Sequence, residues 1–311
     1  MKKAWMMIWA AIVTHVAAFY LMLQGVEPIS ADFYIFAWWT YIVFLSGVNH
    51  LRGRNSLLLD NPGEFVWVFL YSIPVWLFFE IYNFSLNNWH YIGIPVETYL
   101  RWPGYIMSFG TVLPGIFETE TFLKNFGVLT EVRGRPIRVT PALLIRFVVI
   151  GLLVMLFVPF RPDFFFPLVW LGCIFLLDPL IYWRDQRQFS FLGKAEQGDY
   201  AIIVRLLVTG MICGLLWEFW NYWASAKWVY TVPYLGFLKI FEMPMLGFFG
   251  FPPFALECYV LYRAFLMFRE RFIYGRKFIP VVTLLLLIIY CVLAFMGIDR
   301  WTVETYKVTV F

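Results

Sequence analysis

Long apolar runs are the feature of this sequence that most restricts its fold. Runs of roughly 17 to 25 apolar residues recur along the whole chain, and a helix needs this length to cross the hydrocarbon of a membrane. Of the 311 residues, 62% are hydrophobic and 14% are charged, whereas soluble chains are nearer half apolar and a quarter charged. The runs lack the alternation of barrel strands, so helix is the only spanning state open to them. The sequence therefore predicts an all-α polytopic membrane protein.

Hydropathy predicts about nine transmembrane helices and leaves no stretch long enough for a separate soluble domain. The helices are expected at residues 4–23, 33–48, 64–86, 105–123, 142–160, 164–182, 201–223, 245–266 and 278–296. The first run is about 20 residues long, which exceeds the apolar core of a signal peptide, so we expect a retained helix.

The distribution of Lys and Arg predicts the orientation of the chain. Of the 24 basic residues, 15 fall on the side of the N-terminus, 6 fall on the other side, and the remaining 3 lie near helix ends. Positive residues favour the cytoplasmic side. We therefore expect a multi-pass protein of the inner cell membrane with its N-terminus in the cytoplasm and its C-terminus outside.

The sequence contains an internal repeat with an offset of about 139 residues. The corresponding pairs are Glu80 and Glu218, Asn83 and Asn221, Trp89 and Trp228, Tyr91 and Tyr230, Pro95 and Pro233, Gly110 and Gly250, Pro114 and Pro253, and Glu118 and Glu257. Each copy would hold four helices, an even number, so the copies would run in parallel about a pseudo-twofold axis along the membrane normal. We predict a first four-helix repeat over 1–140, a second over 141–268, and a ninth helix with a short outer tail over 269–311.

Glu80 and Glu218 are the candidate catalytic residues, because each is an acid inside a strongly apolar segment. Asn83 and Asn221 follow three residues later and so share a helical face with the acids, to which they could hydrogen-bond. Intramembrane carboxylates are expensive and are commonly functional. The alternative is a structural clamp that holds the following loop to its helix.

Glu118 and Glu257 are candidate ligand-binding residues in the fourth helix of each repeat. Each follows a proline by four residues, in a stretch rich in Gly and Pro that predicts kinked or broken helices. Broken helices at membrane depth commonly line cavities, because their freed backbone groups need partners. By helical rise, these acids lie roughly 10 to 15 Å in depth from Glu80 and Glu218. This separation suits a pathway or a long ligand better than one compact cluster.

Trp89, Tyr91, Trp228 and Tyr230 complete the candidate ligand-binding set, together with Asn83, Asn221, Glu118 and Glu257. The W-x-Y motifs lie in the loops that follow the third and seventh helices. They suit either an interfacial aromatic belt or an aromatic vestibule for an apolar ligand.

Several classes of function are disfavoured. The formal charge of +4 is small and scattered, so nucleic acid is not an expected partner. Only 3 histidines are present, which disfavours a membrane haem, and the lack of a Lys inside any predicted span disfavours a retinal protein. No Walker A, H-E-x-x-H or G-x-S-x-G motif occurs, and the 4 cysteines lie in apolar segments without C-x-x-C spacing. We predict no metal site and identify no cofactor.

The order acid, W-x-Y, proline, acid resembles the integral-membrane lycopene cyclase domain of carotenoid synthesis. The resemblance rests on Trp228 and Tyr230, and on Pro95 and Glu97 in "IPVET", which match part of that family's P-x-E-E motif. It implies intramembrane carboxylates that protonate the end of a polyene and close a ring. Thr98 stands in place of the second acid, the second repeat has "VPYLG" there, and the family's repeats are shorter. The resemblance covers two loops.

The leading functional hypothesis is a membrane protein that binds an apolar ligand (an isoprenoid, quinone or lipid) between the two repeats. Carboxylic-acid chemistry on that ligand would make it an enzyme, and the sequence leaves the enzymatic question open. A proton-coupled transporter of a small molecule and a membrane anchor or scaffold subunit with partner membrane subunits are the alternatives. Membrane lipid is an expected partner in every case.

Overall fold

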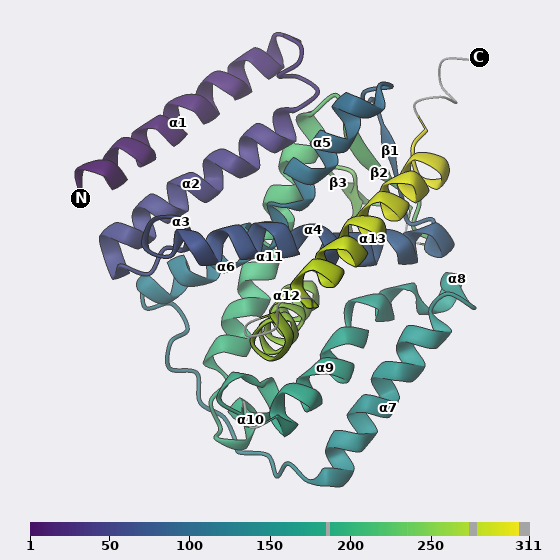
Figure 1. The fold of residues 1–311 in the computed structure, drawn as a ribbon. Helices are drawn as coiled ribbons and strands as arrows, with labels where there is room; N and C mark the ends of the chain where they lie inside the picture. The colour runs from purple at the N-terminus through teal and green to yellow at the C-terminus, as the bar shows by residue number, and fades with distance from the viewer. Residues whose placement is uncertain (185–186, 235, 274–278, 305–311) are drawn as a thin grey trace.

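The computed structural model describes residues 1–184, 187–234, 236–273 and 279–304, and most of them are helical (Figure 1). The elements of the first half are α1 (Lys2–Leu23), α2 (Phe33–Gly53), α3 (Leu57–Asp60), α4 (Pro62–Leu86), β1 (Trp89–Ile92), α5 (Thr98–Phe109) and α6 (Val112–Asn125).

The second half begins with a pair of shorter helices, α7 and α9. Its elements are α7 (Pro141–Phe157), α8 (Pro162–Phe165), η1 (Phe166–Trp170), α9 (Gly172–Trp183), η2 (Arg187–Phe189), α10 (Phe191–Glu196), α11 (Ala201–Trp223), β2 (Lys227–Tyr230), β3 (Lys239–Ile240), β4 (Met243–Pro244), η3 (Met245–Gly250), α12 (Phe251–Phe268), η4 (Arg269–Ile273) and α13 (Ile279–Trp301). The two short sheets are β1–β2 and β3–β4.

Among the described residues, helices overlap all nine segments that the hydropathy indicated, and residue 278 of the ninth lies outside the description. The chain has the architecture of an all-α membrane protein. Among the described residues, 6 helical segments are long and apolar enough to cross a membrane. These are Lys2–Leu23, Pro62–Leu86, Pro162–Trp183, Ala201–Trp223, Met245–Arg271 and Val281–Trp301. Nine spans, the twofold repeat and the domain boundaries remain predictions.

The fourth, sixth and eighth expected helices are broken into pieces. The fourth divides into α5 and α6 at Gly110, and the eighth begins as the 3₁₀ segment η3 before α12. Gly110 is required at its break, since a Cβ there would lie 2.2 Å from a ring carbon of Phe69. The expected single helix over 105–123 therefore starts earlier, at Thr98, and turns at the glycine.

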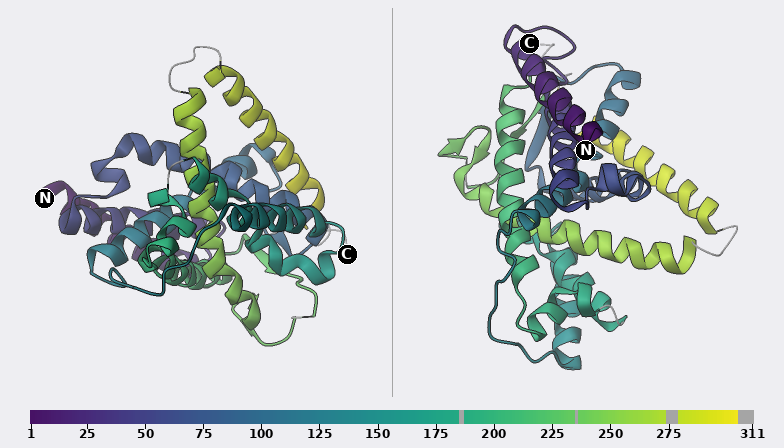
Figure 2. Two further views of the ribbon diagram at one scale, coloured as in Figure 1. Left: turned by 90° about the horizontal axis from the view of Figure 1, so that it is seen from below. Right: turned by 90° about the vertical axis from the view of Figure 1, so that its left-hand side faces the viewer.

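Four helices form the centre of the molecule: α6 and α12 contact each other, and both contact α4 and α11. The α1–α2 pair packs on one side, against α6, and the α7–α9 pair packs against α12 (Figure 1). Figure 2 shows the same elements from two further directions. The last helix, α13, packs against α4.

Two ion pairs join the halves of the chain: one links α4 to η4, which follows α12, and the other links α11 to α6. Glu64 of α4 accepts a hydrogen bond from Arg269 at 2.9 Å and another from Tyr262 of α12. Arg205 of α11 contacts Glu120 of α6 at 2.5 Å. Glu64 and Arg205 lie near the starts of their helices, so both ion pairs are at the end of the bundle opposite the β1–β2 sheet.

Asp299 fastens α13 to the first half through α5. Its carboxylate accepts two hydrogen bonds from Arg101 at 2.7 Å, and one each from Trp102 and Tyr105 at 2.9 Å. Arg101 is 5% exposed, so the charge of Asp299 compensates a buried guanidinium. Bidentate pairs of this kind are among the stronger polar contacts in proteins.

We expect Asp299→Asn to lower the free energy of unfolding by about 2 to 3 kcal/mol, because it removes the negative charge that pairs with the buried guanidinium of Arg101. The measurement is thermal or denaturant unfolding of the purified protein in detergent. Asp163→Asn is the matched control at an exposed position and should change stability by less than about 0.5 kcal/mol. Equal behaviour of the two variants would contradict this role for Asp299.

Candidate functional site

The β1–β2 sheet places four aromatic side chains on one face. Its strands run antiparallel with Trp89 opposite Tyr230 and Tyr91 opposite Trp228. Directly opposed residues, and residues two apart in one strand, project from the same side of a sheet. All four rings line a cavity, whereas His90, the residue between Trp89 and Tyr91, does not.

The chain that follows α13 closes the free edge of β1. Tyr91 N–H donates to the carbonyl of Thr302 at 2.7 Å, and Glu304 N–H donates to the carbonyl of Tyr91 at 2.9 Å. Tyr91 and Val303 thereby form a parallel bridge. A strand edge that is paired in this way is held in position and is not available to other chains.

Asn83 and Asn221 each fix the first residues of a strand to the end of a helix. Asn83 donates to the carbonyl of Trp89 at 2.8 Å, and its oxygen accepts from Asn88 N–H at 2.8 Å. Asn221 donates to the carbonyl of Trp228 at 2.8 Å and accepts from Trp228 N–H at 3.0 Å. The asparagines therefore bond to strand backbone, and among the described residues no hydrogen bond joins them to Glu80 or Glu218. Asn83 and Asn221 are fully buried.

Glu80 binds the polar edges of three aromatic rings with one oxygen. Oε1 accepts from Trp76 Nε1 at 2.8 Å, from Trp89 Nε1 at 3.1 Å and from Tyr91 Oη at 2.5 Å. Oε2 has no hydrogen-bond partner among the described residues, and the side chain is 0% exposed. Trp76 lies four residues before Glu80, on the same helical face.

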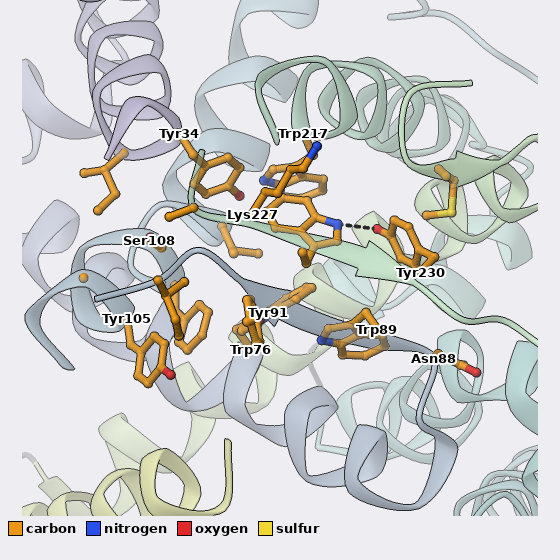
Figure 3. A pocket seen from close by; sticks show the side chains of 18 of the residues that line it. Tyr34, Trp76, Asn88, Trp89, Tyr91, Tyr105, Ser108, Trp217, Lys227 and Tyr230 are labelled. Carbon is orange, nitrogen blue, oxygen red and sulfur yellow. Dashed lines mark hydrogen bonds between the residues drawn. The ribbon is translucent and has the colours of Figure 1, made fainter. Parts of the chain in front are cut away.

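Glu218 makes a shorter version of this arrangement in the second half. Its Oε1 accepts from Tyr230 Oη at 2.7 Å, and Tyr230 Oη in turn accepts from Trp228 Nε1 at 2.8 Å (Figure 3). Its Oε2 also lacks a partner within the described chain. The side chain is 0% exposed. Each acid thus forms hydrogen bonds to side chains of the W-x-Y motif that follows its helix.

The tyrosines of the sheet remain protonated, and so act as hydrogen-bond donors, throughout the physiological pH range. Burial, and then the adjacent Glu80 carboxylate, raises the pKa of Tyr91 well above its ordinary value. Burial, and then Glu218, raises the pKa of Tyr230 in the same way. A phenol with a raised pKa keeps its proton, and each Oη–H is aimed at a glutamate.

An aromatic cavity of about 170 Å³ lies between the sheet and the helices (Figure 3). Both halves of the chain contribute to it, and so do both sides of the predicted helix breaks. Its main lining residues are Tyr34, Trp76, Trp89, Tyr91, Tyr105, Phe109, Trp170, Trp217, Trp228, Tyr230, Phe251 and Phe254, and its charged ones are Asp32, Arg101 and Lys227. Glu80 and Glu218 are not part of the lining, because the rings they bind stand between them and the cavity.

The acids Glu118 and Glu257 lie elsewhere and cap helices. Glu118 accepts from Ser46 at 2.7 Å, from Asn49 at 2.6 Å and from the N–H of Leu57, the first residue of α3, at 2.9 Å. Glu257 accepts from the N–H of Cys173, in the first turn of α9, at 2.8 Å. Neither lines the cavity. The structure therefore brings the W-x-Y motifs, the two asparagines, Glu80 and Glu218 together. It leaves Glu118 and Glu257 apart from them.

Asp178 of α9 is a further capping residue outside the candidate site. It accepts from the N–H groups of Phe191 and Leu192, which open α10, at 2.6 and 2.9 Å. Helix N-termini carry unpaired N–H groups and partial positive charge, so a carboxylate is a natural partner. Within the described residues, no group of three His, Cys, Asp or Glu side chains is arranged to hold a metal ion.

Comparison with known proteins does not assign this arrangement: no family model, no curated protein and no solved structure matches the chain.

We expect Tyr91→Phe to lower the free energy of unfolding by about 1 to 3 kcal/mol, because it removes a donor from a buried carboxylate. Tyr99→Phe is the matched control on a side chain that is 75% exposed, and it should be close to neutral. Denaturant unfolding in detergent measures both. In a Glu80→Gln background the loss from Tyr91→Phe should shrink, and an undiminished loss would show that the hydrogen bond does not matter.

Proposed function

We propose that this protein is a multi-pass protein of the inner membrane that binds an apolar small molecule, such as an isoprenoid, quinone or lipid, in the aromatic cavity. The observation that carries the proposal is the composition of the lining: rings from both halves of the chain, including Trp76, Trp89, Trp217 and Phe254, surround one space. Small-molecule sites are typically concave and apolar, with a few polar groups that fix orientation.

The two halves act in this proposal as parallel repeats that share the cavity. The sheet register supports that relation, because it pairs the first aromatic of one W-x-Y motif with the second aromatic of the other. A twofold axis through the sheet generates this crossed pattern. The excess of Lys and Arg at the opposite side supports an orientation with the cavity toward the outer face of the membrane and the N-terminus in the cytoplasm.

Glu80 and Glu218 have an indirect part in this function. They hold the rings of the lining in place, and any proton that they supply to a bound molecule passes through Tyr91 or Tyr230, whose hydroxyls lie between the acids and the cavity. Acid chemistry on the ligand would therefore be lost in the Tyr→Phe variants as well as in the Glu→Gln variants.

The broken helices support a cavity at this position. Tyr105 and Phe109 precede the break before α6, and Gly250 and Phe251 lie at the junction of η3 with α12. All four line the cavity. A continuous helix in either place would fill this part of the lining with side chains of the next turn.

We expect protein purified gently from its own membrane to carry an apolar compound, and Gly104→Leu to lose it. Gly104 lines the cavity, and a Cβ there meets no atom within 4 Å, so the larger side chain enters open space without strain. Mass spectrometry of an organic extract, with the absorption spectrum of the protein, measures occupancy. The expected change is a loss of about tenfold or more.

Gly63→Leu is the matched control, because Gly63 is also helical and open at Cβ but lies outside the cavity. It should keep the compound at the wild-type level. Equal extracts from both variants would contradict the cavity as the binding site. An empty wild-type protein that arrives with other membrane subunits would favour the anchor function instead.

A further inference from the structure

The rings around the cavity are oriented by the glutamates behind them. Trp76, Trp89 and Tyr91 all direct their N–H or O–H groups at Glu80, which is outside the lining. An aromatic ring is electrically positive at its edge and negative on its face. Because the N–H and O–H groups of these rings point away from the cavity, the rings offer it carbon.

The two cationic side chains of the lining are neutralised by acids. Lys227 pairs with Glu242 at 2.6 Å. Arg101 pairs with Asp299 at 2.7 Å. Neither leaves an excess of positive charge at the cavity, so they do not make it an anion site.

The acids nearest the cavity have no such compensation. Asp32 lines the cavity and, within the described residues, takes part in no ion pair. Among the described residues, Glu80 and Glu218 bind only neutral donors, and each keeps one oxygen without a partner. The surroundings of the cavity therefore hold three acids that lack a cationic partner.

We propose that the cavity binds an organic cation, an amine or quaternary ammonium group, as the polar end of its ligand. This inference rests on the proposed function of the same cavity and names the ligand class. Cations are attracted to the faces of Trp and Tyr rings, and aromatic cages are the common solution for quaternary ammonium groups. The carboxylate of Asp32, which lines the cavity, adds to that attraction.

The size of the cavity agrees with a ligand end and not with a whole ligand. Its volume of about 170 Å³ is below the roughly 300 to 1,000 Å³ of drug-sized sites. A compact ammonium head fits such a space, while an attached apolar chain extends along the helices toward the membrane.

The test compares choline with 3,3-dimethylbutan-1-ol, its neutral isostere in which carbon replaces nitrogen. The full-length protein is placed in nanodiscs of phosphatidylglycerol, which has no amine or choline head group to compete. Titration calorimetry, corrected with empty nanodiscs, gives both affinities. We expect choline to bind at least about tenfold more tightly than the alcohol, and the Gly104→Leu variant to bind neither.

Two variants test the acids. Asp32→Asn removes a charge at the cavity without disturbing the start of α2, because Asp32 makes no side-chain capping bond there. Glu80→Gln removes the acid behind the rings and keeps its shape, and Glu131→Gln is the matched change at an exposed position. Asp32→Asn and Glu80→Gln should weaken choline several-fold and leave the alcohol unchanged, whereas Glu131→Gln should alter neither.

The outcomes separate the inference from the proposed function. Equal affinity for choline and the alcohol, with both lost in Gly104→Leu, overturns the cation inference and leaves an apolar site standing. Choline binding that survives Asp32→Asn and Glu80→Gln also overturns it. If neither compound binds the wild-type protein, the inference is overturned, and the organic extract of the native protein then decides the proposed function separately.

Discussion

The hydrogen bonds to Glu80 and Glu218 are the interactions on which the sheet end of the molecule depends. A carboxylate surrounded by apolar helices needs donors, since burial of such a group without partners is strongly unfavourable. The donors come from the strand that follows each helix, so the sheet exists where it does because the acids hold it. The rings that satisfy the acids on one side form the wall of the cavity on the other. The contacts that hold the sheet are therefore the same contacts that form the wall of the cavity.

The remaining buried acids cap the starts of helices, and they do so from different positions in the two halves of the chain. In the first half, Glu118 of α6 caps the short helix α3, and in the second half Asp178 of α9 caps the short helix α10. Glu257, which corresponds to Glu118 in sequence, is then free to cap the broken start of α9. Residues at matching positions of similar segments need not keep matching partners.

The sequence predicted much of the helical framework, because long apolar runs have few alternatives. It also gave the helix breaks around Gly110 and Gly250, where glycine and proline interrupt the apolar pattern. It did not predict that β1 pairs with β2. A four-residue aromatic strand after a helix looks the same as an interfacial belt, and the pairing depends on two segments that are far apart in the chain.

Individual contacts between residues far apart in the chain were also not predictable from the sequence. Trp76 could have been added to the site from its spacing of four residues before Glu80. Asp299 could not, since nothing near it in the chain indicates that Arg101, Trp102 and Tyr105 converge on it. The clamp and the ligand hypotheses for Glu80 do not exclude each other, because a residue that positions the wall of a cavity serves both.

The strand edge that Thr302 and Glu304 supply to Tyr91 has a consequence for how the protein is made. β1 leaves the ribosome long before the segment that will pair with its free edge, and α13 must be inserted in between. Contacts of such high sequence separation form late. During synthesis, the wall of the cavity formed by β1 therefore remains incomplete, and its final shape depends on insertion of the last described helix.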